Sequence, residues 1–145
     1  MRLAALLFLL VPIFCKGQII VDKAGDGWDL KIDSAINLIK QYDSTKYNLL
    51  LNVCNKIEFW NGNYSTNDGK KTIVVSVNDV KLNSLNNLAS VVIHESFHLY
   101  LSEKSLDTKK EENMCYRYEL SFIKKLPNIE EWLWSHILKQ IIVTE

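Results

Sequence analysis

Two of the three histidines in this chain lie four residues apart, with a glutamate between them, in the segment HESFH at residues 94–98. Residues four apart on an α-helix share one face, with their β-carbons about 5–6 Å apart. His94 and His98 can therefore direct two imidazole nitrogens at one metal ion, and zinc is commonly bound in this way. At about 100° per residue, Glu95 points to the side of this pair, next to the metal without having to bind it.

The position of Glu95 suits a general base. A zinc ion lowers the pKa of a bound water toward ~7. A neighbouring carboxylate can take a proton from that water and pass it to a leaving amine. The alternative is that His94 and His98 are two core histidines that happen to lie close together. His136, isolated near the C-terminus, is interpreted as a structural residue.

A catalytic zinc site also needs a third protein ligand and an open position for water. The extended motif HExxHxxGxxH requires glycine at position 101 and histidine at position 104, whereas this chain has Leu101 and Lys104. The metzincin arrangement is thereby excluded, and a downstream acid must serve as the ligand. The candidates are Asp107, Glu111, Glu112 and Glu119.

HESFH followed by an acidic helical segment resembles the gluzincin family of zinc metallopeptidases, in which a glutamate from the next helix completes the HExxH site. Residues 112–115, with the sequence ENMC, are similar to the Glu-x-x-small pattern of that family. The resemblance covers about residues 57–125 and implies a zincin-like fold with Glu112 as the third ligand. Glu119 is the second choice for this ligand, and Glu111 is a further alternative.

The chain also departs from the gluzincin pattern. Larger members have an aspartate four residues after the ligand glutamate, which supports the first histidine, whereas Tyr116 stands at that position here. Glu119, seven residues after Glu112 and on the same helix face, is an alternative support for a ligand. The candidates to donate a hydrogen bond to a developing oxyanion are Tyr64, Tyr116, Arg117 and Tyr118.

The remaining sequence predicts the elements that hold this site. Apolar residues recur at Ile32, Ala35, Ile36 and Ile39, which predicts a helix over residues 28–42. A short helix over 50–54 and a strand over 57–60 follow. The β-branched segment at 72–77 predicts a second strand, joined to the first as a hairpin through turns at 61–63 and 67–69. Strand 72–77 resembles the sheet edge along which zincins bind an extended peptide.

Helices predominate in the second half of the chain. Ser84 is a predicted N-cap for a central helix that runs to about Glu103 and carries HESFH. Thr108 and Glu111 fit a capping box for a helix that ends near Lys125. Asn128 is predicted to cap a last helix together with Glu131. The fold class is therefore α+β: a short hairpin or small sheet packed on the HExxH helix, with flanking helices.

The length of 145 residues indicates one domain, and 48% hydrophobic residues are typical of a globular protein. Lys and Arg together number 17, as do Asp and Glu, so no net charge favours nucleic acid or an anionic membrane as a partner. The predicted partner is a peptide or unfolded protein substrate.

The N-terminus has the pattern of a secretory signal. Arg2 precedes an apolar run over residues 3–14, which is shorter than the ~20 residues that span a bilayer. Cleavage after Gly17 would leave residues 18–145 as a single secreted or periplasmic domain. A lipoprotein signal, with lipid on Cys15, is the less favoured alternative. The two remaining cysteines, Cys54 and Cys115, either pair or are buried thiols.

These features predict an exported zinc metallopeptidase that holds one Zn²⁺ per chain through His94, His98 and Glu112, with Glu95 as general base. Two alternatives stay open. The first is a self-blocked or non-catalytic zinc protein, in which a C-terminal helix containing Trp132 and Trp134 covers the site. The second is a binding module of the same fold that uses no metal.

Overall fold

The computed structural model describes residues 17–24 and 26–145. Apart from Gly17, the predicted signal segment lies outside the described residues, and so does Cys15 with its lipoprotein alternative. The described chain has six helices and a four-stranded sheet, which confirms the α+β class. None of the described helices is both long enough and apolar enough to cross a membrane.

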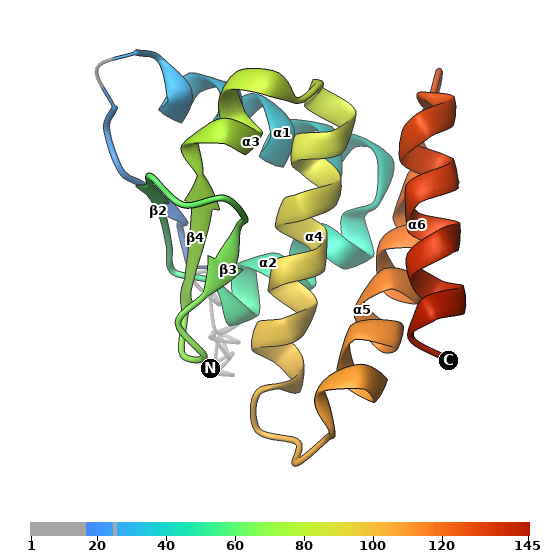
Figure 1. The fold of residues 1–145 in the computed structure, drawn as a ribbon. Coiled ribbons are helices and arrows are strands. Elements are labelled where there is room, and N and C mark those ends of the chain that lie inside the picture. Colours follow the sequence, from blue (N-terminus) through green and yellow to red (C-terminus); the bar gives the residue numbers. More distant parts are fainter. Residues whose placement is uncertain (1–16, 25) are drawn as a thin grey trace, which may run out of the picture.

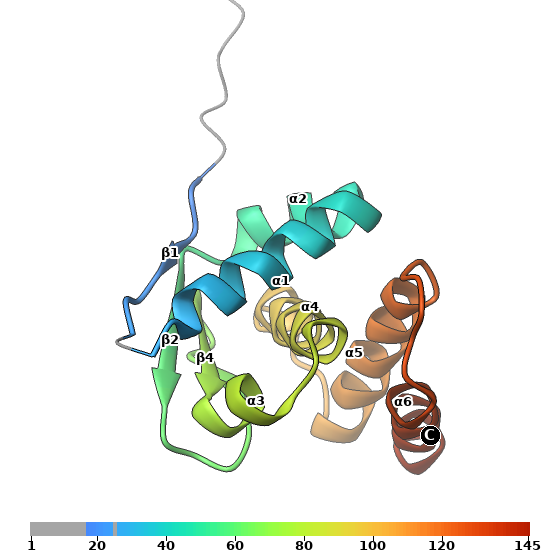
Figure 2. The same cartoon turned by 90° about the horizontal axis from the view of Figure 1, so that it is seen from above.

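Helix α4 (Leu85–Leu101) lies at the centre of the molecule. The sheet flanks it on one side and helices α5 and α6 on the other (Figure 1). Seen from above, α1 and α2 cover a further side (Figure 2). The other helices are α1 (Trp28–Tyr42), α2 (Ser44–Val53), α3 (Val77–Leu82), α5 (Thr108–Ile123) and α6 (Glu131–Val143).

The sequence of α4 accounts for its central position. The helix starts as predicted at Ser84, whose side chain accepts a hydrogen bond from the backbone N–H of Asn87 at 3.1 Å. It is apolar on most sides and buries Leu88, Ala89, Val92, Ile93, Leu99 and Leu101. The HESFH motif therefore lies in the second half of a helix that is fixed by packing on several sides.

The sheet has the strand order β1-β2-β4-β3. Strands β1, β2 and β4 are parallel, and β3 is antiparallel to β4. The strands are β1 (Ile20–Val21), β2 (Lys56–Trp60), β3 (Thr66–Asn67) and β4 (Thr72–Ser76). The predicted strand at 57–60 is confirmed, with one more residue at its start.

The prediction that residues 57–60 and 72–77 form a hairpin is wrong, because β2 and β4 run parallel. Hydrogen bonds at the end of β4 explain the difference. The backbone N–H of Ser76 donates to Ser65 Oγ at 2.9 Å, and Ser76 Oγ donates to the carbonyl oxygen of Gly62 at 2.6 Å. The loop after β2 therefore crosses the end of β4, and the chain returns on the far side as β3.

A hairpin does form between β3 and β4, at the predicted turn over 67–69. Asp68 Oδ1 accepts hydrogen bonds from the backbone N–H groups of Lys70 and Thr72, and Gly69 has a φ of 67°. The strand at 72–77 was expected at the edge of the sheet, which is wrong, because β4 lies between β2 and β3. The short strand β3 forms the edge that faces α4 (Figure 1).

Several helix boundaries differ from the prediction. Helix α2 starts at Ser44 rather than near Leu50, because the Asp43 side chain accepts a hydrogen bond from the backbone N–H of Lys46 and caps it. Val77 begins α3 instead of ending the strand, since Ser76 caps that short helix.

The caps of the last two helices also differ. The cap of α5 is Asp107, one residue before the predicted Thr108, and it accepts from the backbone N–H of Lys110 at 3.0 Å. Glu130, not Asn128, stands at the N-cap of α6, and no side-chain cap bond forms there. Asn128 instead adopts a φ of 54°, a left-handed conformation that asparagine tolerates.

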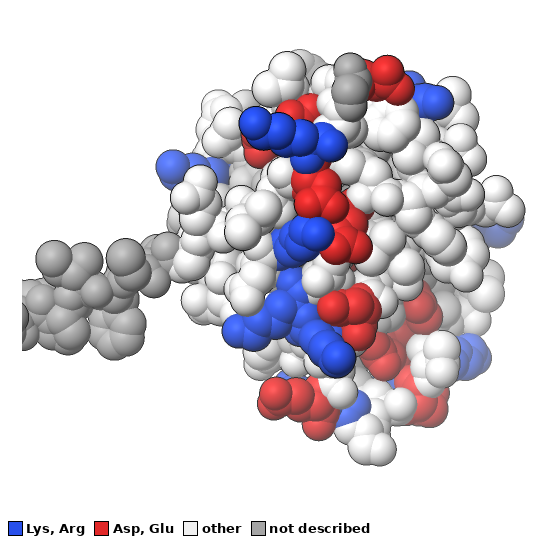
Figure 3. Space-filling model, turned by 90° about the vertical axis from the view of Figure 1, so that its left-hand side faces the viewer, with Lys and Arg blue, Asp and Glu red and all other residues white. Residues whose placement is uncertain are grey.

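One hydrophobic core joins the sheet to the helices, and Cys54 belongs to it. Cys54 and Cys115 are both buried and both free, so they do not form the disulfide considered from the sequence. Acidic and basic side chains are mixed on the face of the molecule in Figure 3, where they form one band next to largely uncharged surface. That face presents no broad surface of a single sign.

Candidate metal centre

Helices α4 and α5 form the candidate centre between them. His94 and His98 lie on the face of α4 toward α5, with ring centroids 4.9 Å apart. Their Nε2 atoms are 3.1 Å apart. The four-residue spacing of HESFH therefore brings the two imidazoles together as expected for one helix face.

Glu112, in the first half of α5, faces both histidines. Its Oε1 atom lies 3.3 Å from His98 Nε2, and its Oε2 atom lies 3.5 Å from His94 Nε2. Tetrahedral zinc with bonds of about 2.0–2.1 Å to nitrogen and oxygen places neighbouring ligand atoms about 3.3 Å apart. The separations among the two Nε2 atoms and the Glu112 carboxylate match that spacing, so these residues fit a zinc ion.

Two further carboxylates, those of Glu119 and Glu111, lie behind the histidines. Glu119 Oε2 is 3.0 Å from His94 Nδ1, and Glu111 Oε1 is 2.7 Å from His98 Nδ1. An Nδ1–H that donates to a carboxylate fixes the tautomer and leaves the Nε2 lone pair free for a metal. Ser90, one turn before His94, donates to Glu119 Oε1 and holds that carboxylate in place.

The surrounding carboxylates determine the charge state of the cluster. Burial lowers the pKa of His94, but hydrogen bonds with Glu112 and Glu119 outweigh it and raise the pKa to about 10. Burial also acts against a charged His98, whose pKa is nevertheless raised by Glu112 and Glu111. The hydrogen bonds from both histidines hold the pKa of Glu112 well below its usual range. The cluster is therefore built to hold positive charge, which protons or a metal ion can supply.

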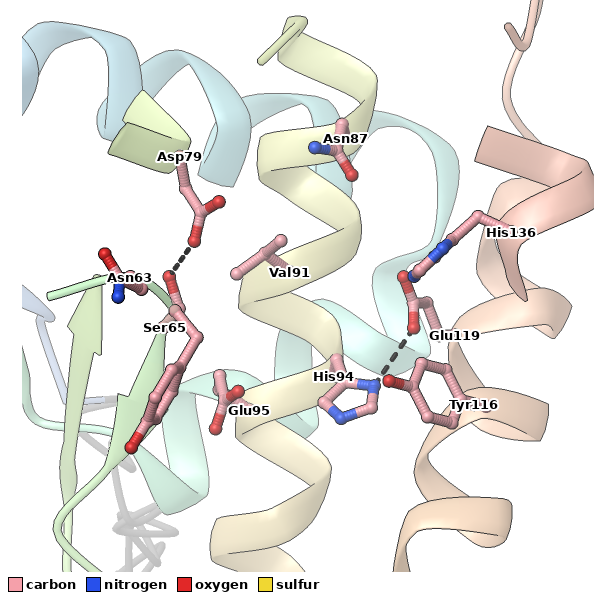
Figure 4. Close-up of a pocket in the computed structure, with 11 residues that line it drawn as sticks. Asn63, Ser65, Asp79, Asn87, Val91, His94, Glu95, Tyr116, Glu119 and His136 are labelled. Carbon is pink, nitrogen blue, oxygen red and sulfur yellow. Dashed lines mark hydrogen bonds and ion pairs between the residues drawn. The ribbon is translucent and has the colours of Figure 1, made fainter. Parts of the chain in front are cut away.

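Glu95 projects from α4 on the sheet side of His94 (Figure 4). Its side chain is buried, with 8% of the residue exposed. Its Oε2 atom accepts a hydrogen bond of 2.9 Å from the side-chain amide of Asn67 on β3. This bond fixes the orientation of the carboxylate at the wall of a cavity that His94 also lines.

Two adjoining cavities, of about 400 and 340 Å³, lie beside the centre and together form the cleft. Both are lined by Tyr64, Ser65, His94, Glu95 and Tyr116. The smaller one also reaches His98, Glu112 and β3, and the larger extends toward α3 and His136. A ligand in the cleft would therefore contact the histidines, Glu95 and the edge strand at once.

The candidate oxyanion donors divide into two groups. Tyr116 and Tyr64 line both cavities, and the Tyr116 ring lies 4.6 Å from that of His94. Arg117 points elsewhere and contacts Asn113 and Glu145. Tyr118 stacks on Phe97 at 4.0 Å and lines neither cavity.

The other acids and histidines have separate positions. Asp107 caps α5 and does not contact the histidines. His136, interpreted from the sequence as structural, is an exposed residue of α6 that lines the larger cavity. Trp132 and Trp134, on the same helix, line neither cavity, and α6 packs against α5.

Cys115 is a further potential ligand. One ligand atom each from His94, His98 and Cys115 all lie within 4.8 Å of one another. Burial, with added repulsion from Glu112 and Glu111, raises the pKa of the Cys115 thiol well above its usual value. The sequence signal for this proximity is the position of Cys115 three residues after Glu112, and therefore on the same face of α5.

Two residues of the centre, Ser90 and Asn67, were not predicted from the sequence. Ser90 lies four residues before His94, so a helical wheel could have placed it below that ring. Asn67 is far from HESFH in the chain and gives no local signal, because its contact with Glu95 depends on the crossing of the loop before β3.

Comparison of this chain with family models, with curated proteins and with solved structures found no match.

Proposed function

We propose that this protein is a zinc metallopeptidase in which His94, His98 and Glu112 hold one zinc ion. The observation that carries the proposal is the convergence of both Nε2 atoms on the Glu112 carboxylate, while each Nδ1 contacts its own carboxylate. Two histidines, one carboxylate and an adjoining cavity match the donor set of catalytic zinc sites.

When bound, zinc would supply a Lewis acid that polarises the scissile carbonyl and lowers the pKa of water. Glu95 takes a proton from the attacking water and delivers it to the leaving amine. The hydrogen bond from Asn67 keeps the Glu95 carboxylate oriented toward the cleft. Burial raises the pKa of Tyr116, and the nearby carboxylates raise it further, to about 12. The hydroxyl is therefore protonated at neutral pH and can donate a hydrogen bond to an oxyanion.

The arrangement of the elements supports a zincin-like fold of the gluzincin type. A small sheet with an antiparallel edge strand lies along the HExxH helix, and the third-ligand helix follows it in the chain. Strand β3 offers backbone groups at the cleft, to which an extended peptide can add by β-pairing. Because the cleft is small, the substrates are short or unfolded peptides.

The experiment that tests this proposal combines metal analysis with a peptide-hydrolysis assay. Purified residues 18–145 should hold close to one zinc per chain by mass spectrometry. Glu112→Ala should lose most of that zinc. Glu95→Gln should keep the zinc and lose hydrolysis, because the amide preserves the shape of the side chain but cannot take a proton.

Glu131→Gln, on the exposed first turn of α6, is the matched control and should keep both zinc and activity. Full hydrolysis by Glu95→Gln would refute the proposed mechanism. If the protein is folded and binds no zinc, the histidines of HESFH are core residues, and the metal-free binding module becomes the favoured alternative.

The position of Cys115 favours a second candidate function, a non-catalytic zinc protein. If the thiol joined His94, His98 and Glu112, the site would have four protein ligands and no open position. Cobalt substitution distinguishes the two candidates, since a thiolate–Co²⁺ bond gives a charge-transfer band in the near ultraviolet.

A band that is absent from Cys115→Ser and present in Cys54→Ser would establish the closed site. Its absence from the wild-type protein would favour the open catalytic site. The other alternative, occlusion by the C-terminal helix, has less support, because Trp132 and Trp134 do not line the cleft and α6 reaches only the larger cavity, through His136.

A further inference from the structure

The larger cavity extends beyond the metal centre toward α3, and this extension is lined by polar groups. Asn63 and Ser65 from the loop before β3, Asp79 from α3 and Asn87 from α4 border it. In Figure 4, Asp79 and Ser65 meet at the far end from His94, with Asn63 beside them. We call these four residues the acidic arm of the cleft.

Asp79 carries the only carboxylate of the acidic arm, and neutral partners hold it in position. Its Oδ2 atom accepts from Ser65 Oγ at 2.6 Å, and its Oδ1 atom accepts from the Asn83 side-chain amide at 3.1 Å. Neither donor is charged, so the hydrogen bonds orient the carboxylate without neutralising it.

No Lys or Arg in residues 17–24 and 26–145 forms an ion pair with Asp79. Lys31 reaches the end of α3, but its ammonium donates to the backbone carbonyl oxygens of Val80 and Asn83. The lining of the larger cavity contains no lysine or arginine. An orienting network without a cation leaves Asp79 available to a positive group in the cavity.

Asp79 also differs in role from the other acids of the cleft. Glu112 and Glu119 contact the imidazoles, and Glu95 lies next to them on α4. Asp79 belongs to a different element and contacts neither histidine. The Asp79 carboxylate therefore plays no part in holding the histidines, and its charge is available to bind a group of the substrate.

We propose that the acidic arm is a subsite for a cationic group of the peptide substrate, with Asp79 as its specificity-determining residue. The group is an ammonium or guanidinium, supplied by a lysine or arginine side chain or by a free peptide N-terminus. This inference rests on the proposed peptidase function, because it assigns one part of the substrate to one part of the same cleft.

The test uses zinc-loaded protein and matched peptides that differ at one position, with lysine, arginine, glutamine or glutamate there. One set has an acetylated N-terminus and a second set has a free one. The wild-type protein should prefer a cationic peptide over its glutamine counterpart about tenfold in kcat/KM, a preference that shrinks at high salt. The acetylated set reports on side chains, and comparison of the two sets reports on the terminal ammonium.

Asp79→Asn should reduce this preference to about one, and the loss should lie in KM rather than kcat. Asparagine keeps a side-chain oxygen that accepts from Ser65, so the arm should retain its shape. The matched control is Asp33→Asn, which removes an exposed charge from α1 outside the cleft and should retain the preference. An unchanged preference in Asp79→Asn, or none in the wild-type protein, would overturn the subsite.

Direct binding separates this inference from the proposed function. Titration of the same peptides into zinc-loaded Glu95→Gln should give tighter binding of the cationic peptides, which Asp79→Asn in that background removes. If the wild-type protein hydrolyses no peptide, the peptidase proposal fails, and the titration still decides on the subsite. Equal affinity for cationic and neutral peptides would refute it.

Discussion

Two partly buried clusters of ionisable side chains lie along helix α5 and the turn that follows it, and they are organised differently. In one cluster, Lys125 Nζ is 2.8 Å from Asp43 Oδ2, and Lys46 Nζ lies 3.2 Å from the centre of the Tyr118 ring. Each cation there faces an anion or an aromatic ring. In the metal centre, by contrast, two imidazole nitrogens and a carboxylate converge on one another.

The difference shows what a functional cluster requires. Opposite charges in direct contact satisfy each other, so the lysine cluster is complete as it stands. At 3.1 Å, the Nε2 atoms of His94 and His98 cannot both direct a proton at each other without repulsion. Two imidazole nitrogens and a carboxylate that converge beside a cavity are stabilised best by a cation bound between them. The lysine cluster has no such position for a cation.

The largest effect is expected when the candidate metal centre loses one of its two histidines. His98→Gln removes one of the convergent nitrogens and should weaken zinc binding by more than the roughly 100-fold loss that follows removal of an outer partner. Competition with a chromophoric chelator measures the change. Lys46→Met, in the other cluster, should leave zinc affinity unaltered. Equal zinc affinity in His98→Gln and the wild-type protein would show that His98 is not a ligand and that the two clusters do not differ in this respect.

The second prediction concerns the lysine cluster and pH. Burial lowers the pKa of Lys46 to about 8, despite the opposing effect of Asp43. Above pH 8 the unfolded chain retains a proton on Lys46 that the folded chain has released, so the contribution of Lys46 to stability rises with pH from 8 toward 10.5, whereas that of His94, whose pKa is raised, falls as pH rises. Relative to Lys46→Met, the wild-type protein should therefore gain roughly 2 kcal/mol in its free energy of unfolding between pH 7 and pH 10.

Denaturant unfolding at several pH values measures this slope. Lys40→Met is the control, since Lys40 is exposed and lies 5.6 Å from the ring centre of Tyr47. It should keep the wild-type slope. The same pH dependence of stability in Lys46→Met and in the wild-type protein would contradict the assignment to Lys46.

Zinc itself should stabilise the fold. A ligand that binds only the folded state raises the free energy of unfolding by about 2.7 kcal/mol at a concentration 100 times its Kd. Calorimetry should show a higher Tm with zinc, a return to the lower value with a chelator, and little response in His98→Gln. A Tm that is insensitive to zinc in the wild-type protein would contradict a folded-state site.

The smallest effects concern the carboxylates behind the histidines. Glu119→Gln should weaken zinc binding about 10- to 100-fold, because the amide no longer holds the His94 tautomer as a carboxylate does. Glu111→Gln should cost less, since its side chain is 26% exposed compared with 7% for Glu119. The same chelator competition ranks the two variants, and the reverse order would show that exposure does not control the contribution.

The parts of this protein that sequence could predict are local in the chain. The helix that carries HESFH follows from its Ser84 cap and its apolar residues, whereas Glu112, which lies beside both histidines, was indicated by the resemblance of residues 112–115 to the gluzincin pattern. The same reasoning allowed Glu119 as a support for a ligand. The structure places Glu119 behind His94 and Glu111 behind His98, although both had been considered as ligands.

What the sequence did not predict depends on contacts between distant segments. The parallel pairing of β2 and β4 requires the loop that Ser76 anchors, and strand propensity carries no information about this crossing. The same crossing brings Asn67 to Glu95 and Ser65 to Asp79. A local sequence pattern therefore could not predict the acidic arm or the orientation of the Glu95 carboxylate.

Apart from Asn67, the residues of the candidate metal centre, from Ser90 to Glu119, lie within two successive helices joined by a short connection. Contacts between residues this close in the chain cost little loop-closure entropy and form quickly. The helical pair can therefore assemble before the slower pairing of strands that are distant in the chain. If the centre holds zinc as proposed, the cleft is completed around a site that already exists, and metal supply during folding determines how much metal-loaded protein is obtained.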